Sequence, residues 1–348
     1  MEQDLRQRIF ERLEQEVAEK GSLTREELTH FHVDGHTYRL IDRNKGIWNP
    51  QGFAATLSIL SKPDSPYADM AVGESLYAYD YRAGNVNGDN TKLRRAFELE
   101  LPVILLRWIS IGSAIRYVPV FPVFVVADNR DQEQFILALD QSLRSVSDPS
   151  HLKPIERVYA QRVQKQRLHQ PEFRGRVLLA YRNRCTVCYL GHAQLLDAAH
   201  IISDGKPHGT AEVANGLSMC KIHHAAYDAN LLGISPAYQV HIGALLMEDH
   251  GTSPTLQHAL QGIDSQELNL PHRKADRPSR ERLAERFSAF QSGASPVHSQ
   301  RIGTIDIARP AMPLEVSRSL ASRRTDTVAT TADATGTTQE LPPGHTRQ

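Results

Sequence analysis

The chain between residues 185 and 228 contains four informative pieces: Cys185-Thr-Val-Cys188, Asp197-Ala-Ala-His200-Ile, Asn215-Gly-Leu and Cys220-Lys-Ile-His223-His224-Ala-Ala-Tyr-Asp228. Thiolates and imidazoles that bind zinc come in closely spaced pairs on two separate turns. The first piece supplies two cysteines two residues apart, and the last repeats that gap between a cysteine and a histidine. We therefore expect a tetrahedral structural Zn²⁺ site formed by Cys185, Cys188, Cys220 and His223. This site would use all three cysteines of the chain.

The remaining donors in these pieces are of a harder kind. They are His200, Asn215, His224 and Asp228. Nitrogen and oxygen donors of this type suit a divalent cation that acts on phosphate. His224 and Asp228 are four residues apart, so on a helix they share one face and can hold one metal ion from one side.

The order His200, Asn215, His224 resembles the ββα-metal module of HNH endonucleases, in the variant braced by a structural zinc. The resemblance implies that His200 ends a strand and is the general base that activates water. It implies that Asn215 holds His200 in its productive orientation and that His224 binds the catalytic metal. That metal, Mg²⁺ or another divalent cation, would neutralise charge on the scissile phosphate and the leaving 3′ oxygen.

One position departs from this family pattern. Many HNH endonucleases carry Asp or His immediately before the base, where this chain has Ala199. Asp197 lies on the same side of a strand as Ala199 and is the candidate for the missing ligand. Without Asp197, the metal would be held by His224, Asp228, water and DNA.

Alternatives exist for each motif. A Cys-x-x-Cys pair can be a redox site, but that motif requires a helix directly after it, and here Tyr189-Leu-Gly-His192 predicts a turn. The whole module can also be a zinc-braced DNA-binding or regulatory protein without cleavage. Within the enzymes, the alternative is an HNH nuclease that acts on unmodified DNA.

Basic residues are concentrated just before the module. The chain of 348 residues has a formal net charge of zero, so a nucleic-acid surface has to come from local clustering. Residues 151–185 contain nine basic and two acidic side chains. We expect DNA phosphate contacts from Arg174, Arg176, Arg182 and Arg184. The alternative is an ordinary solvated helix face.

The amino-terminal half has the pattern of a mixed α+β domain. Helical spacing covers residues 5–20, 24–31 and 91–99. Short β-branched or aromatic segments bounded by turn residues predict strands at 37–41, 75–79, 103–107 and 121–126. We predict a strongly bent sheet, and an α+β fold class for the chain as a whole.

Aromatic and amide side chains gather in this half. They are Trp48, Tyr77, Tyr79 and Tyr81, with Asn85, Asn87, Asp89 and Asn90. The segment resembles the amino-terminal domains of predicted McrA-like, modification-dependent (type IV) restriction endonucleases, which look SRA-like or PUA-like. That resemblance implies a pocket for a flipped base, which needs an aromatic face to stack on and polar groups to read its edge. Alternating aromatics in a strand can equally be plain core.

These patterns divide the chain into four parts. We predict a modified-DNA reader domain over 1–148, a linker over 149–160, an HNH endonuclease domain over 161–292 and a largely disordered tail over 293–348. The nuclease part includes a helix at about 161–181, a closing strand near 238–242 and a helix near 279–291.

The expected substrate is double-stranded DNA, with or without modified bases. Two cuts across a duplex need two modules, which a homodimer would supply; the alternative is a monomer that nicks one strand. The sequence shows neither a secretory pattern nor an apolar run long enough to span a bilayer. Since the three cysteines also suit a reducing compartment, we expect a cytoplasmic protein without membrane contact.

Overall fold

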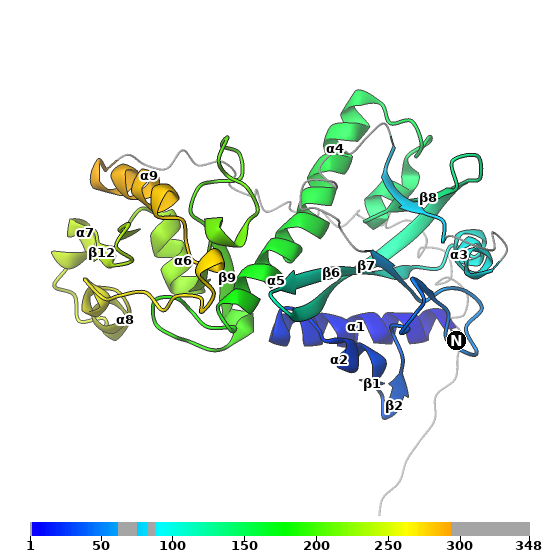
Figure 1. Ribbon diagram of the computed structural model, residues 1–348, viewed down its shortest axis with the longest axis horizontal. Helices are drawn as coiled ribbons and strands as arrows, with labels where there is room; N and C mark the ends of the chain where they lie inside the picture. The colour runs from blue at the N-terminus through cyan, green and yellow to red at the C-terminus, as the bar shows by residue number, and fades with distance from the viewer. Residues whose placement is uncertain (1, 62–74, 83–87, 294–348) are drawn as a thin grey trace, which may run out of the picture. The chain divides into compact units, whose positions relative to one another are not determined.

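The computed structural model describes residues 2–61, 75–82 and 88–293 (Figure 1). Asn85, Asn87 and the tail expected over 293–348, except its first residue, lie outside the described residues. Within the described part, no helix has the length and apolar character needed to cross a membrane.

Two helices open the chain close to where the sequence predicts them. Helix α1 spans Glu2–Lys20 and buries a stripe that includes Ile9, Phe10 and Leu13. Helix α2 spans Arg25–Thr29 and begins with a capping box, in which Thr24 and Glu27 bond each other's backbone N–H groups. Such reciprocal bonds satisfy N–H groups that a helix start otherwise leaves unpaired.

A hairpin follows these helices. It consists of β1 (Phe31–Val33) and β2 (His36–Tyr38). The strand predicted over 37–41 is thus only partly formed. Leu40 and Ile41 are buried, but the Leu40 N–H donates to the carbonyl of Leu28 at the end of α2 rather than to a strand.

The amino-terminal half is built on one six-stranded sheet in the order β3-β4-β6-β7-β8-β5. Its strands are β3 (Ile47–Trp48), β4 (Ser58–Ser61), β5 (Tyr77–Asp80), β6 (Val103–Ile111), β7 (Ala114–Asn129) and β8 (Gln134–Ala138). The β4–β6 pair is parallel and the others are antiparallel. Helix α3 (Asp89–Glu98) packs on β7.

Strand β7 curls this sheet. Its first part pairs with β6 and its last part with β8, and the register shifts once in each pairing. Such irregularities bend the strand and increase its twist. The predicted mixed α+β architecture with a bent sheet is therefore confirmed, with longer central strands than the sequence suggested.

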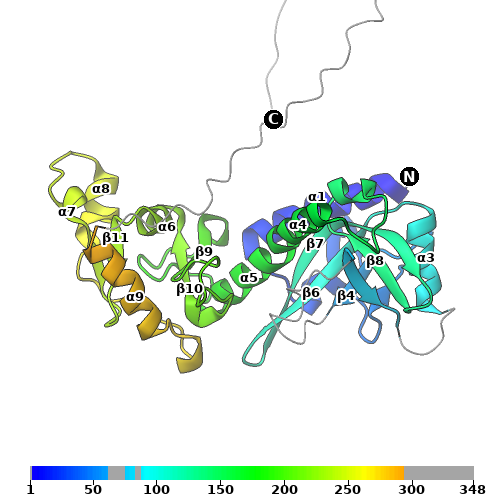
Figure 2. The ribbon, with the colours of Figure 1, turned by 90° about the horizontal axis from the view of Figure 1, so that it is seen from above.

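A helical rod connects the two halves (Figure 2). After a 3-10 turn η1 (Gln141–Ser145), the rod consists of α4 (Pro154–Gln164), a π-helical turn η2 (Lys165–His169) and α5 (Gln170–Ala180). The residues expected to form a linker, 149–160, are thus helical from Pro154 onward. Proline suits this first helical position because its fixed φ matches a helix and its missing N–H would have no helical partner.

The rod belongs to two hydrophobic cores. Ala160, Val163 and Leu168 pack in the core of the amino-terminal sheet. Leu178 packs in the core of the carboxy-terminal half. One continuous helical segment therefore supplies side chains to the cores of both halves.

The carboxy-terminal half begins with a ββα unit. A 3-10 turn η3 (Ala193–Leu195) leads into β9 (Leu196–His200), and η4 (Val213–Asn215) leads into β10 (Gly216–Cys220). The two strands are antiparallel, with His200 opposite Gly216. Helix α6 (Lys221–Asp228) follows β10 directly.

Further elements complete this half. They are β11 (Leu232–Ile234), β12 (Val240–Ile242), α7 (Ala244–Met247), α8 (Pro254–Ala259), η5 (Gln261–Ile263), η6 (Lys274–Asp276) and α9 (Arg280–Gln291). Strand β12 pairs with β11. Strand β12 and helix α9 correspond to the closing strand and the last helix that the sequence predicts. Ser279 caps α9 through its hydroxyl.

Candidate metal centre and active site

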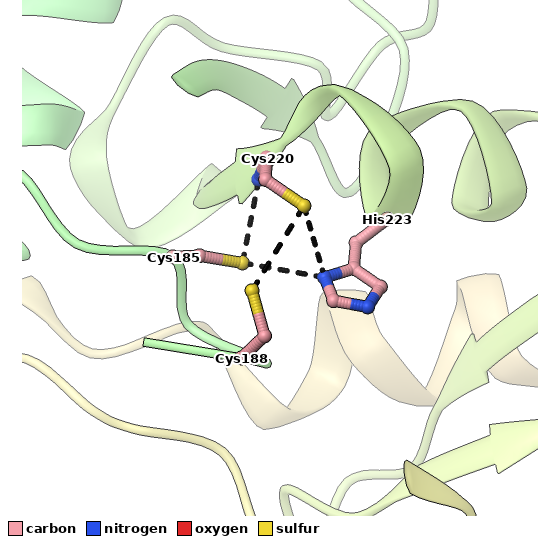
Figure 3. Close-up of side chains that lie close together, drawn as sticks. All are labelled: Cys185, Cys188, Cys220 and His223. Atoms are coloured by element: carbon pink, nitrogen blue, oxygen red, sulfur yellow. Dashed lines mark hydrogen bonds between the residues drawn. The ribbon is translucent and has the colours of Figure 1, made fainter. Parts of the chain in front are cut away.

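The four predicted zinc ligands converge in the structure (Figure 3). The Cys220 Sγ lies 3.2 Å and the Cys185 Sγ lies 3.5 Å from Nδ1 of His223, and the Cys188 Sγ lies 3.9 Å from that of Cys220. Zn–S bonds of about 2.3 Å and Zn–N bonds of about 2.0–2.1 Å place tetrahedral ligands roughly 3.5–3.8 Å apart. The cluster therefore fits one tetrahedral ion.

Among the described residues, this is the one group of three or more potential ligands with all ligand atoms within 4.8 Å of one another. Its supporting contacts also suit a metal. The Nε2–H of His223 donates to the carbonyl of Ala259 at 2.8 Å, which leaves the Nδ1 lone pair directed at the sulfurs. The Cys220 N–H donates to the Cys185 sulfur at 3.3 Å. Hydrogen bonds from Cys185 and Cys188 lower the pKa of the Cys220 thiol, which favours the thiolate that binds metal.

His200 occupies the end of β9, as the sequence predicts. Its ring stacks on Phe173 of α5, with centroids 4.0 Å apart and planes 19° apart. Its buried Nε2 has no hydrogen-bond partner among the described residues. Burial lowers the pKa of His200 below its ordinary value, so the neutral imidazole prevails at neutral pH. A neutral ring with an unpaired nitrogen can accept a proton, which is the requirement for a general base.

Two hollows in the surface meet at His200. One is a cavity of about 510 Å³, whose polar lining includes Lys165, His169, Lys206 and Thr210. The other is a cleft of about 1300 Å³ whose lining includes Asp197, His200 and His224. The base predicted from β9 and the metal ligand predicted from α6 therefore open onto the same space.

The side chain of Asn215 acts on the backbone that follows His200. Its Nδ2 donates to the carbonyls of Ile202 and Thr210, both at 3.0 Å, and its Oδ1 accepts from the Ile202 N–H at 2.9 Å. The backbone carbonyl of Asn215 accepts a hydrogen bond from the Ile201 N–H. The resemblance implied that Asn215 orients His200, and these contacts provide a route through the chain rather than through a bond to the ring.

His224 lies between two carboxylates. Its Nδ1 is 3.5 Å from Asp197 and its Nε2 is 3.2 Å from Asp228. Burial lowers the pKa of His224, but the two carboxylates outweigh this and raise it to about 9. Asp197 also accepts from Lys221 at 2.5 Å, and its pKa is held well below the ordinary value, first by His224.

This arrangement limits how a metal ion can bind. Since the two carboxylates face opposite nitrogens of one imidazole, an ion on one nitrogen has only one of them beside it. Asp228 is exposed, whereas Asp197 is partly buried and also has Lys221 and Arg174 beside it. An ion on Nε2 of His224 would have Asp228 beside it, and an ion on Nδ1 would have Asp197 beside it. Ligation by His224, Asp228 and Asp197 stays a prediction.

The four arginines expected to contact DNA fall into two pairs. Arg174 donates to the carbonyls of Ala193 and Leu196, and Arg176 lies 3.4 Å from Glu172, so both are engaged within the protein. Arg182 and Arg184 are exposed, and Arg184 lies over the ring of Tyr189. DNA contact remains a prediction for all four, and exposure favours the second pair.

The tyrosines of the expected base pocket lie on one face of β5 and the residue after it. All three are partly buried and pack against the core of the amino-terminal sheet. The hydroxyl of Tyr77 is bonded to Ser61 and Arg107, that of Tyr79 to Gly46 and Leu60, and that of Tyr81 to Asp128 and Arg94. Trp48 is half-buried, and its Nε1–H donates to the carbonyl of Arg39. These contacts resemble ordinary core packing, and base recognition stays a prediction.

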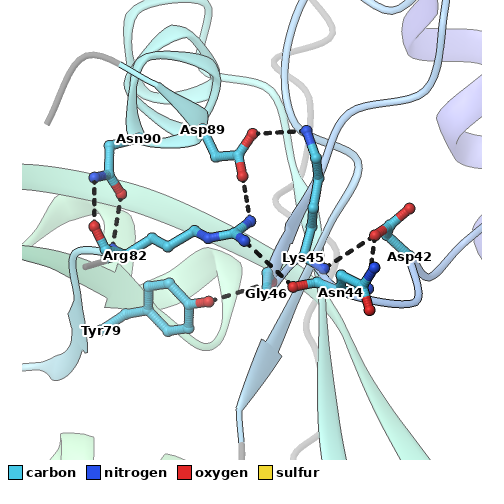
Figure 4. Close-up of polar contacts among 8 residues, drawn as sticks. All are labelled: Asp42, Asn44, Lys45, Gly46, Tyr79, Arg82, Asp89 and Asn90. Carbon is cyan, nitrogen blue, oxygen red and sulfur yellow. Dashed lines mark hydrogen bonds and ion pairs between the residues drawn. The ribbon is translucent and has the colours of Figure 1, made fainter. Parts of the chain in front are cut away.

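A polar network lies beside Tyr79, whose hydroxyl donates to the carbonyl of Gly46 (Figure 4). Asp89, at the start of α3, pairs with Lys45 and Arg82. The side chain of Asn90 bonds both the N–H and the carbonyl of Arg82. Two of the polar residues expected to read a base edge, Asp89 and Asn90, thus hold α3 against neighbouring loops.

Sequence reasoning missed three residues of the site. Phe173 stacks on His200, the Ala259 carbonyl accepts a hydrogen bond from His223, and Lys221 pairs with Asp197. None of them has a motif of its own. The one available signal was Gly216, directly after Asn215, because a glycine in a strand often marks a close approach of another element.

Comparison with known proteins agrees with this geometry. Residues 185–235 match the family model described as HNH endonuclease. This HNH segment contains the four predicted zinc ligands, and also His200, Asn215, His224 and Asp228, and it indicates a nuclease. No curated protein matches the chain.

Solved structures give weaker likenesses. For a "Modification dependent TagI restriction endonuclease" the identity is 19% and the TM-score 0.28, over 76% of this chain and 89% of that chain. For the "Type IV phosphorothioation-dependent restriction endonuclease ScoMcrA" the identity is 13% and the TM-score 0.20, over 61% of this chain and 51% of that chain. TM-scores this low carry no argument about this chain.

Proposed function

We propose that the chain is an HNH-type DNA endonuclease that hydrolyses phosphodiester bonds, and that it is a restriction enzyme directed at modified DNA. The observation that carries the nuclease assignment is that His200 and His224, both in the HNH segment, line the same cleft. A zinc-braced binding protein would need neither an unpaired, neutral imidazole nor a second set of donors beside it.

The residues divide the work of hydrolysis. His200 accepts the proton of the attacking water, and Asn215 fixes the backbone that carries His200. His224, through Nε2, and Asp228 would hold a divalent cation, with Asp197 orienting the ring from Nδ1. When bound, such a cation stabilises negative charge on the phosphate and on the leaving oxygen.

The Cys185, Cys188, Cys220 and His223 cluster is proposed to hold structural Zn²⁺. Four protein ligands close a tetrahedral zinc site and leave no position for water or substrate. This site therefore has no part in the chemistry. It fixes the start of α6, from which His224 projects.

Recognition of modified bases is proposed for the amino-terminal sheet. The support is that the two end strands of this sheet carry aromatics, Trp48 on β3 and Tyr77 and Tyr79 on β5, with Tyr81 directly after β5, and that a polar network lies beside Tyr79. A flipped base needs both kinds of contact. Cleavage would then depend on a modification that the HNH segment itself does not read.

Variant His200→Ala tests the nuclease assignment. Loss of a general base costs about 100-fold to 10,000-fold in rate, so this variant should keep its zinc, its fold and its DNA binding while cutting far more slowly. The matched control is His192→Ala, an exposed histidine that no predicted site contains.

The substrates are plasmids that are plain, methylated, hydroxymethylated or phosphorothioated, each with Mg²⁺, Mn²⁺, Co²⁺ or Ni²⁺. Cleavage that is equal on all plasmids would remove modification dependence and keep the nuclease. DNA binding by the wild type without cleavage on any plasmid would establish the binding-protein alternative instead.

A further inference from the structure

Helix α5 lies unusually close to the strand pair that carries His200. Gly216 is opposite His200 in the β9–β10 pairing. A Cβ atom on Gly216 would lie 2.4 Å from Cγ2 of Val177 and 2.9 Å from Cζ of Phe173. Only glycine leaves room for these two side chains, and this room lets the Phe173 ring reach the imidazole.

Glu172, the residue before Phe173, connects the same helical turn to the amino-terminal sheet. Glu172 is buried and forms an ion pair with the equally buried Arg107 of β6. Arg107 also donates to Ser61 Oγ and to Tyr77 Oη, both at 2.8 Å. A buried ion pair is stable only when its geometry is good and its remaining hydrogen-bonding groups are satisfied, so these contacts hold Glu172 in one place.

A second close approach supports this anchor. A Cβ atom on Gly175 would lie 2.9 Å from Cδ1 of Ile109 and 3.1 Å from Cγ2 of Val118. The amino-terminal sheet and the β9–β10 pair therefore both contact α5 within a few residues of Phe173. The position of its ring is set from both sides.

We propose that Phe173 is a positioning residue for the general base His200, and that the buried Arg107–Glu172 pair anchors it. This inference rests on the proposed function. The aromatic face fixes the plane of the imidazole and keeps water from one side of it. Through Arg107, the anchor also ties that position to Tyr77 on the amino-terminal sheet.

The pH response of His200 should then depend on this stack. The charged or titratable groups that act on His200 are Lys165 of the π-helical turn, Asp204 of the loop after β9, and His224 and Asp228 of α6. Lys165 and Asp204 are paired at 2.7 Å and have opposite effects on the imidazole, as do His224 and Asp228. Burial is the largest influence on the ring, and Phe173 is a direct source of that burial.

Variant Phe173→Leu removes the ring and keeps an apolar side chain. The pKa of His200 is measured by NMR titration of histidine ring signals in the DNA-free, full-length protein, with the signal assigned by its loss in His200→Ala. We expect it to rise toward the ordinary value of about 6.5. The acid limb of the kcat profile should move with it, and kcat at neutral pH should fall about 10-fold to 100-fold with KM unchanged.

The matched control is Phe287→Leu. Phe287 lies on α9, and its ring packs against His241 of β12. This variant should leave the His200 titration and the cleavage profile as in the wild type. If Phe173→Leu does not fold, Phe173→Met replaces it, because methionine fills irregular space with a similar volume. A folded, zinc-loaded Phe173 variant with an unchanged His200 titration and pH profile would overturn the positioning role.

The anchor is tested by the double variant Arg107→Met/Glu172→Leu, since replacing both buried charges avoids leaving one unpaired. We expect a shift of the His200 titration in the same direction as in Phe173→Leu. A folded double variant without that shift would remove the anchor from the proposal. Because the titration needs no DNA, it separates the two ideas: a wild type that cuts nothing refutes the proposed function and leaves the stack testable.

Discussion

His223 and His224 are neighbours on one helix, yet they lie in opposite kinds of environment. His223 is 1% exposed, with one ring nitrogen on two sulfurs and the other on a backbone carbonyl. His224 is 24% exposed, with a carboxylate at each nitrogen, one of them 62% exposed. Consecutive helical residues point about 100° apart, so one step along α6 separates a closed centre from an open one.

The difference separates the two proposed metal positions by the kind of donor that each one offers. Soft sulfur ligands surround the buried position, which suits a permanent Zn²⁺. Oxygen and imidazole donors surround the accessible position, which suits an ion that meets phosphate. The closed centre fixes α6, and α6 in turn presents the open one.

The largest effect is expected from breaking the closed centre. Variant Cys188→Ser should lose its bound zinc, its cooperative unfolding transition and all cleavage, because structural zinc supplies folding free energy directly. Zinc content by elemental analysis and unfolding by circular dichroism measure this, with His192→Ser as the control. A folded, metal-free wild type would show that the four ligands are not a zinc site.

An intermediate effect is expected at the open centre, where Asp228 and Asp197 take different roles. Asp228→Ala should remove a direct ligand, whereas Asp197→Asn should weaken only the orientation of His224, at a cost of about 10-fold to 100-fold in metal affinity or activity. Neither variant should change zinc content. Mn²⁺ titration by calorimetry and cleavage rates measure both. A larger loss for Asp197→Asn would place the ion on the Nδ1 side of the ring instead.

The smallest effect is expected on DNA binding by the amino-terminal sheet, where Trp48 is half-buried. Trp48→Ala should weaken binding to modified duplex by about 1–3 kcal/mol and leave unmodified duplex unaffected, because a lost stacking ring costs about that much. Tyr159→Ala is the control, since this exposed tyrosine of α4 lies outside the proposed base-recognition residues. Affinities are compared at one salt concentration, because the phosphate contribution depends steeply on salt. Equal losses for both duplexes would make Trp48 a general contact.

The sequence predicted which three cysteines and which histidine come together, because the spacing of such residues is a local property. The gap between Cys185 and Cys188, repeated in Cys220 and His223, was enough to predict the cluster that the structure brings together. The resemblance to HNH endonucleases also implied that His200 ends a strand, and His200 is the last residue of β9. Which nitrogen of His224 faces which carboxylate depends on packing between β9 and α6, and no spacing reports that.

The contacts that the sequence did not predict join elements that are distant along the chain. The stack of Phe173 on His200 and the bonds of Asn215 to Thr210 depend on how α5 and a loop pack against β9. The expected linker over 149–160 was misleading for a related reason. A polar stretch before Pro154 has the composition of a break, but the helix that starts there is stabilised by side chains buried in a core built by other strands.

The rod of α4, η2 and α5 determines how this protein can be divided. A fragment that ends at residue 148 would lack Ala160, Val163 and Leu168, and so would expose part of the core of the amino-terminal sheet to water. Burying one such larger side chain contributes roughly 1.5–3 kcal/mol, a sizeable share of the stability of a small domain. A fragment of the amino-terminal half should therefore be stable only if it retains the helical residues that fill its core.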